Sequence, residues 1–145
     1  MKKYELTDET IEVYGTALHR IKALKDFGNV KKGELGGYVE SERNLSQEGN
    51  CWVYGNAWVY GNAWVCGNAE VCGNADYITI KGLGSVCRNT TIFRTKENIA
   101  VKCGCFYGTL AEFVDKVKET HGNSKFTKEY LALIDLVKIH FELEE

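Results

Sequence analysis

The spacing of hydrophobic and polar residues changes along the chain, and each spacing predicts a different element. Near the start, Ile11 and Val13 alternate with polar residues up to the turn Tyr14-Gly15-Thr16. The segment from Leu18 to Leu24 then returns, which is typical of a β-hairpin. A glycine-rich passage with loosely recurring apolar residues continues to residue 48. We expect residues 1–48 to form an N-terminal hairpin and an irregular lead-in coil.

From residue 49 the spacing becomes six without slippage, in the units GNCWVY, GNAWVY, GNAWVC, GNAEVC and GNADYI. An aliphatic position recurs at Val53, Val59, Val65 and Val71, and a small one at Ala57, Ala63, Ala69 and Ala75. A narrow triangular prism needs branched residues for its sides and small residues beside its corners, where Gly-Asn tolerates positive φ. These units resemble the hexapeptide-repeat family, in which three hexads make one turn. The resemblance implies a short left-handed parallel β-helix over residues 49–78.

The remaining residues, 79–145, predict a C-terminal α/β cap with two helices. Strand-like runs at 91–94 and 99–103 flank Lys96-Glu97-Asn98 and predict a second hairpin. Thr109-Leu-Ala-Glu112 is a capping-box pattern, and His121-Gly122 is a helix stop. A second helix is expected to start near Thr127. The predicted fold is mainly β with C-terminal helices (α+β): a short left-handed parallel β-helix capped by an N-terminal β-hairpin and a C-terminal ββαα segment.

The outer positions of the hexads carry large aromatic side chains. They are Trp52, Tyr54, Trp58, Tyr60 and Trp64. Fully exposed, they would form a larger apolar surface than monomers usually tolerate. Two interpretations stay open: other parts of the chain pack over them, or they contact another molecule, as Trp and Tyr do in interfaces.

Charge and composition exclude several classes of function. The net charge is −2, from 18 basic and 20 acidic side chains, and only Glu70 and Asp76 are charged within residues 49–78. We therefore expect no direct nucleic-acid binding by the repeat. The N-terminus lacks the apolar segment of a signal peptide, and no run approaches the roughly 18 apolar residues of a membrane span. The expected location is cytoplasmic, without membrane association, and the six cysteines are expected to be free thiols.

Candidate chemistry is sparse. Arg88, Arg94 and Lys96, with Lys102, gather in the second predicted hairpin, either as a solvated surface or as an anion or nucleotide contact. Cys103-Gly-Cys105 lacks the spacing of a zinc motif. We expect no metal and no cofactor. No histidine lies in the repeat, and no catalytic arrangement is recognisable, so we expect a non-enzymatic protein with no catalytic residues, with an acyltransferase relative as the lesser alternative.

The overall layout also resembles small proteins encoded by phages and prophages of Firmicutes-type bacteria. The resemblance lies in Asp26-Phe-Gly-Asn-Val-Lys-Lys-Gly33, Leu35-Gly-Gly37, Ser46-Gln-Glu-Gly-Asn50 and Glu119-Thr-His-Gly122. It implies a phage accessory protein that acts in the host cytosol. Such a protein would bind and inhibit or sequester a host factor, such as a CRISPR effector, as an anti-CRISPR protein does.

The partner of that protein would be a host protein or ribonucleoprotein, and the chain could form a dimer or trimer. We expect its binding residues to be Trp52, Tyr54, Trp58, Tyr60, Trp64, Arg88, Arg94 and Lys96. Three alternatives stay open. They are a sponge for a nucleotide signal at an oligomer interface, a hexapeptide acyltransferase relative, and a structural assembly module.

Overall fold

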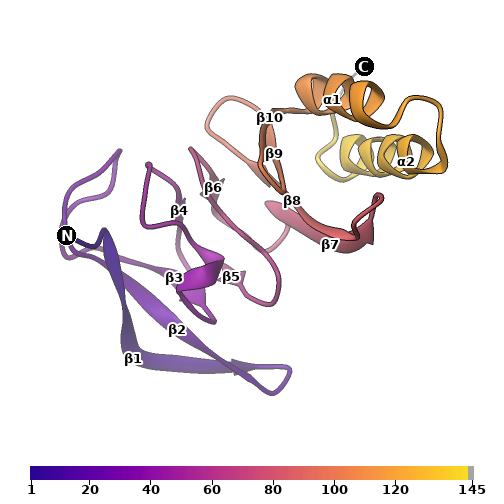
Figure 1. Ribbon diagram of the computed structural model, residues 1–145. Coiled ribbons are helices and arrows are strands. Elements are labelled where there is room, and N and C mark those ends of the chain that lie inside the picture. The colour runs from indigo at the N-terminus through magenta and orange to yellow at the C-terminus, as the bar shows by residue number, and fades with distance from the viewer. Residues whose placement is uncertain (144–145) are drawn as a thin grey trace.

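The chain begins with a long antiparallel hairpin, which forms one end of the computed structural model (Figure 1). The structure describes residues 1–143. Strand β1 (Tyr4–Val13) pairs with β2 (Thr16–Ala23) across a turn in which Tyr14 and Gly15 both have positive φ. The predicted N-terminal hairpin is therefore confirmed.

The middle of the chain contains short strands linked by tight turns. The elements are β3 (Leu35–Val39), the 3-10 helix η1 (Glu42–Asn44), β4 (Trp52–Val53), β5 (Trp58–Val59) and β6 (Glu70–Val71). These strands divide between two sheets. One sheet has the order β1-β2-β3-β5, and the other consists of β4 and β6 alone.

The predicted left-handed parallel β-helix over residues 49–78 is wrong, because no continuous solenoid sheet runs through this segment of the described chain. Trp52 does pair in parallel with Glu70, 18 residues or three hexads later, as the hexad spacing predicts. The preceding turn is longer, since Tyr38 pairs with Trp58 and Leu45 bridges to Val65, both 20 residues apart. The lead-in therefore breaks the hexad register, and only two residues of each short strand join a ladder.

The inner positions of the hexads form the core nonetheless. Side chains of one buried cluster include Val53, Val59, Val65 and Val71, together with Ala57, Ala63 and Ala69. The same cluster contains Tyr4 and Ile21 of the hairpin, and Phe93 and Ala100 of the C-terminal part. The coil is therefore stabilised by both flanking segments. The division of the chain at residues 48 and 78 stays a prediction.

An antiparallel sheet follows the coil. Its strands are β7 (Tyr77–Leu83), β8 (Arg88–Arg94), β9 (Ile99–Cys103) and β10 (Phe106–Thr109), in the order β10-β9-β8-β7. The predicted hairpin at 91–94 and 99–103 is confirmed by the pairing of β8 with β9. The prediction of only two strands in this cap is wrong, because β7 and β10 extend the sheet on both sides.

The two predicted C-terminal helices are present at the far end of the molecule (Figure 1). Helix α1 (Leu110–His121) begins with the expected capping box and ends at Gly122, which has a φ of +58°. Helix α2 (Lys125–His140) buries one face against the sheet and α1. Within residues 1–143, no helix is both long and apolar enough to span a bilayer.

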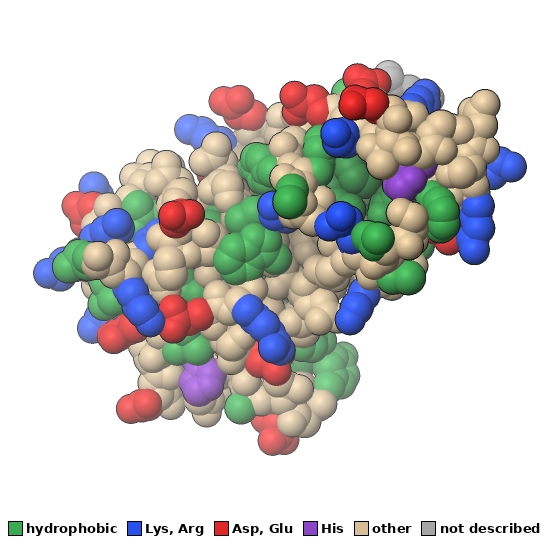
Figure 2. Space-filling model, in the orientation of Figure 1, with side chains coloured by type: hydrophobic (Ala, Val, Ile, Leu, Met, Phe, Trp, Pro, Cys, Tyr) green, Lys and Arg blue, Asp and Glu red, His purple; other side chains and the backbone are tan. Residues whose placement is uncertain are grey.

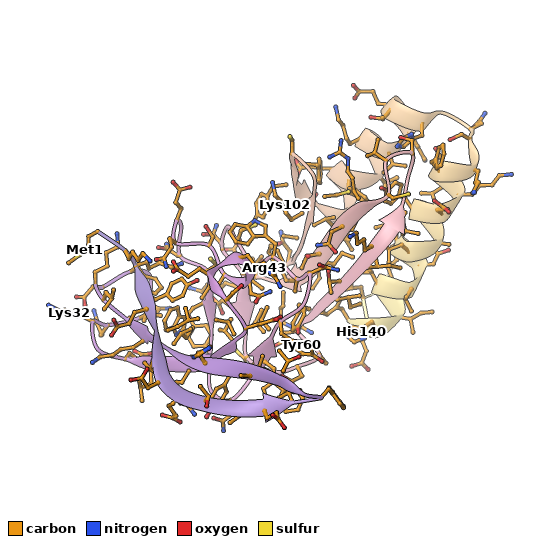
Figure 3. The ribbon with its side chains drawn as sticks, turned by 60° about the horizontal axis from the view of Figure 1, so that its bottom comes forward. Met1, Lys32, Arg43, Tyr60, Lys102 and His140 are labelled. Atoms are coloured by element: carbon orange, nitrogen blue, oxygen red, sulfur yellow. The ribbon has the colours of Figure 1, made fainter. Side chains whose placement is uncertain are left out.

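The end of α2 also contacts the coil. A ring nitrogen of His140 lies 2.7 Å from the carbonyl oxygen of Ala75, to which it donates a hydrogen bond. Arg94 pairs with Asp76 at 3.1 Å and lies over the ring of Phe141. Figure 3 shows His140 on the side of α2 that faces the sheet and the coil. These contacts fix the C-terminal half relative to the coil.

Candidate functional site

A cleft of about 650 Å³ lies where the coil meets the C-terminal sheet. The cleft is lined by the loop after β2, the coil, the turn between β8 and β9, residues of β9 and β10, and the start of α1. The lining residues are Gly28, Asn29, Asn50, Tyr54, Asn68, Glu70, Thr95, Lys96, Glu97, Asn98, Ala100, Tyr107, Gly108, Thr109 and Glu112. Hydrophobic side chains gather in the hollowed middle of the face seen in Figure 2, between the N-terminal sheet and the helices.

The coil supplies Tyr54 and Glu70. The backbone N–H of Tyr54 donates to Val71 at 2.7 Å, which fixes Tyr54 beside the β4–β6 ladder. Glu70 is half-buried in β6, and its side chain has no hydrogen bond or ion pair with the described residues. Burial raises the pKa of Tyr54, and the charge of Glu70 adds to that rise. Glu70 is therefore a carboxylate beside the cleft that the protein itself does not neutralise.

Tyr107 of β10 forms another wall by packing against the coil. Its hydroxyl accepts a hydrogen bond from the backbone N–H of Asn68 at 3.5 Å, and its ring lies 6.2 Å from that of Phe93. A methyl group at Gly67 would overlap the hydroxyl and ring of Tyr107. Gly67 therefore has two roles: it adopts the positive φ of the coil's corner, and it leaves space for the ring of Tyr107.

The turn between β8 and β9 presents Lys96 and Glu97. Thr95 and Asn98 close the turn: the Thr95 N–H donates to the Asn98 carbonyl at 2.8 Å, and the Asn98 N–H donates to the Thr95 hydroxyl at 3.0 Å. The two intervening side chains are exposed at the rim of the cleft. Because the turn is held at both ends, their backbone positions are well defined.

The start of α1 closes the cleft with a carboxylate that already has partners. The backbone N–H of Thr109 donates to Glu112 at 2.9 Å, and the backbone N–H of Glu112 donates to the Thr109 hydroxyl at 3.2 Å. Glu112 therefore stabilises the helix end. The charged groups left for a ligand are Glu70, Glu97 and Lys96. Amide and hydroxyl groups make up most of the remaining polar lining.

The structure brings two of the predicted binding residues, Tyr54 and Lys96, into this cleft. Trp52 does not face solvent: it has 0% exposure and packs against Tyr4 and Phe27. The hairpin and β3 cover part of the other aromatics, since Trp58 and Tyr60 pack against a cluster of Val13, Leu18 and Tyr38. Trp64 is half-buried, and its backbone N–H donates to Thr91. The intramolecular interpretation therefore holds at Trp52 and in large part at Trp58 and Tyr60.

The basic residues of the predicted hairpin do not converge. Arg88 and Arg94 occupy opposite ends of β8, and Arg94 is paired with Asp76. Only Lys96 of the three predicted basic residues lines the cleft. The two arginines share a face of β8 but lie six residues apart, which in an extended strand is about 20 Å.

The sequence interpretation missed Glu70, Asn68, Asn98 and Tyr107 as cleft residues. A signal existed for Glu70, because the hexad spacing aligned it with Trp52. Tyr107 lies in a strand that was not predicted and meets the coil only after folding. Among residues 1–143, no group of three or more His, Cys, Asp or Glu side chains could hold a metal ion.

Comparison with known proteins adds one partial similarity. No protein-family model matches the chain. The chain is 40% identical over 62 residues to a protein of Escherichia coli (strain K12) named "Uncharacterized acetyltransferase YdcK". The match covers 37% of this chain, and the chain spans only 19% of the length of that relative. The similarity is therefore to part of a protein named as an acetyltransferase. The expectation of a non-enzymatic protein is wrong on this finding, because the relative is named as an enzyme.

Proposed function

We propose that the protein binds a small hydrophilic molecule in the cleft between the coil and the C-terminal sheet. The observation that carries this proposal is the cleft itself, with Glu70 unpaired on one wall. Its volume of about 650 Å³ lies within the range of small-molecule sites. Amide side chains and tyrosine hydroxyls can donate and accept hydrogen bonds, which suits a ligand bearing several hydroxyl groups.

The charges favour a neutral or cationic ligand over an anion. Glu70 and Glu97 face a single lysine, Lys96, among the residues of the cleft that are not already paired. A phosphate group would be opposed by the two carboxylates, whereas an ammonium group could pair with Glu70. A hydroxyl-rich amine is therefore the ligand class that the lining supports best.

Calorimetric titration with glucosamine, and with glucose as its neutral counterpart, tests the proposal. We expect glucosamine to bind more tightly than glucose, and Glu70→Gln to remove that preference. Glu12→Gln is the matched control, because Glu12 is exposed near the tip of the hairpin and outside the cleft. Binding of neither sugar, or equal loss in both variants, would contradict the proposal.

A second candidate function is transfer of an acetyl group to such an amine. It is supported by the partial match to a relative named as an acetyltransferase. In this reaction the amine, in its neutral form, attacks the thioester carbonyl of acetyl-coenzyme A and the new carbon–nitrogen bond replaces the carbon–sulfur bond. The nitrogen loses a proton, and the departing thiolate takes up a proton to leave as coenzyme A thiol. Glu70 is the unpaired carboxylate that can accept that proton.

Release of coenzyme A thiol from acetyl-coenzyme A, measured with and without glucosamine, tests this second function. Amine-dependent release that Glu70→Gln abolishes would support transfer. Binding of glucosamine without thiol release would sink the acetyl-transfer proposal and leave the binding proposal standing.

Inhibition of a host-defence factor, implied by the resemblance to phage proteins, remains a third proposal. The surface on which it rested included the aromatic side chains at the outer positions of the hexads, and of these Trp52 is buried. Exposed residues elsewhere would have to contact the host protein. Trp64→Ala and Tyr14→Ala are the informative variants, because both side chains reach the surface and Tyr14 forms the hairpin tip. If both variants still captured a host partner as well as the wild type does, Trp64 and Tyr14 would not contact that partner, and the aromatic version of this proposal would be wrong.

A further inference from the structure

Helix α2 carries a second apolar stripe on the face turned away from the sheet. Its inner face buries Tyr130, Leu133, Ile134 and Val137. On the outer face, Leu136 is 51% exposed and Ile139 is 75% exposed, and Ala132 lies one turn before Leu136. The spacing i, i+4, i+7 places these three residues in one line along the helix. Within residues 1–143 nothing covers this line.

A shallow hollow runs beside the stripe. It is lined by Asp135, Lys138, Ile139, Glu142 and Leu143. The hollow makes the outer face concave beside Ile139, so that a side chain of a partner can pack there. An apolar line beside a groove is the form in which one helix receives another.

The edge of α2 beside the hollow carries a basic side chain at its start and an acidic side chain just after its end. Lys128 is exposed and lies seven residues, close to two helical turns, before Asp135, which places both on the same edge. Glu142 lies at the other end and lines the hollow together with Asp135. Asp135 is therefore near the midpoint between a basic end and an acidic end.

We propose that the outer face of α2 pairs antiparallel with the same face of a second copy of the chain. A two-fold axis perpendicular to the helix reverses its direction and keeps each edge opposite its own counterpart. With the axis near Asp135, Lys128 of one copy meets Glu142 of the other, twice. Leu136 lies one residue from this midpoint and packs against its counterpart.

The geometry also limits the strength of this dimer. The helix has 16 residues, which corresponds to a length of about 24 Å. One helix pair of this length buries less than the roughly 1,200 Å² of a stable interface, so the dimer is weak and concentration-dependent. The two Asp135 carboxylates also face each other at the axis, with Lys138 on the same edge, and like charges oppose association.

Sedimentation velocity of the full chain, from about 1 µM to 1 mM, tests the proposal. The wild type is expected to shift from monomer to dimer in this range. Leu136→Lys should weaken the dimer by about tenfold or more, since about half of a leucine surface loses its burial. Leu35→Lys is the matched control, because Leu35 is equally exposed at 51% but lies in β3.

Charge variants test the direction of the pairing. Lys128→Glu and Glu142→Lys should each weaken the dimer, and the double variant should restore it. Asp135→Asn should strengthen it. A strict monomer throughout the range, a dimer insensitive to Leu136→Lys, or a dimer that Leu35→Lys disrupts equally would overturn the proposal. Circular dichroism of each variant verifies that α2 is intact.

Discussion

Replacing Gly67 by alanine should destabilise the protein more than the same replacement at Gly61. Both glycines occupy corners of the coil with nearly equal φ, +62° and +67°. A Cβ atom there costs roughly 1–2 kcal/mol in the left-handed region. At Gly61 nothing lies within 4 Å of the added atom, whereas at Gly67 the atom would overlap Tyr107. The two variants therefore share the backbone strain and differ in the contact.

The extra cost at Gly67 follows from what Tyr107 must give up. Its ring packs 6.2 Å from Phe93, and its hydroxyl accepts the Asn68 N–H. The side chain is 42% exposed, so it can move outward, which limits the added cost to about 1–3 kcal/mol. Gly61→Ala should then cost roughly 1–2 kcal/mol and Gly67→Ala roughly 2–5 kcal/mol.

Urea unfolding followed by tryptophan fluorescence measures both values. The same pair of substitutions in a Tyr107→Ala background completes a double-mutant cycle, and there the difference between Gly67 and Gly61 should largely disappear. Equal losses at the two glycines in the wild-type background, within about 0.5 kcal/mol, would refute the role assigned to Gly67. Gly67→Ala should also weaken glucosamine binding, because Tyr107 walls the cleft.

Three further predictions concern buried groups. Burial lowers the pKa of Lys3, whose ammonium donates to the Cys51 carbonyl at 2.8 Å, so the unfolded chain binds more protons as pH approaches 10.5. Unfolding free energy should therefore rise with pH just below 10.5 relative to Lys3→Met, and parallel pH profiles would contradict this. Burial raises the pKa of Cys66 to about 11. The neutral thiol therefore contributes its full share to the unfolding free energy below pH 9, and this contribution is lost as pH rises through 11. At pH 8, mass spectrometry should show slower iodoacetamide labelling of Cys66 than of exposed Cys105, and equal rates would refute this. The Trp52 indole N–H is buried without a partner among the described residues, so Trp52→Phe should cost under about 2 kcal/mol and Trp52→Ala about 3–5 kcal/mol in urea unfolding; equal costs would indicate a partner for that N–H.

Local patterns predicted the elements whose contacts are close in sequence. The hairpin turn at Tyr14-Gly15 and the capping box of Thr109 and Glu112 depend on residues one to three positions apart. The inner hexad positions were also predictable, because Val53 and its equivalents must be buried wherever the chain coils. Periodicity of this kind reports which face is apolar.

Long-range register could not be predicted in the same way. The β-helix prediction failed because the turn from Tyr38 to Trp58 holds 20 residues, so the regular spacing does not extend into the lead-in. The strands β7 and β10 depend on pairing with β8 and β9. In β7 the alternation of Ile78 and Ile80 with Thr79 and Lys81 was a signal that the sequence interpretation missed, whereas β10 has only four residues. The cleft could not be predicted for the same reason, since Tyr107 contacts the coil only because β10 pairs with β9.

The outer hexad positions acquire different roles because different segments pack over them. Trp52 is covered by Tyr4 and Phe27 and becomes part of the core. Its ladder partner Glu70 has no such cover and remains beside the cleft. A carboxylate is costly to bury without a partner, so the segments that cover the coil must stop short of Glu70 or supply a cation. They supply Lys96 only at the rim. The opening around Glu70 is therefore a consequence of placing an acid in a position where the neighbouring turn carries a tryptophan.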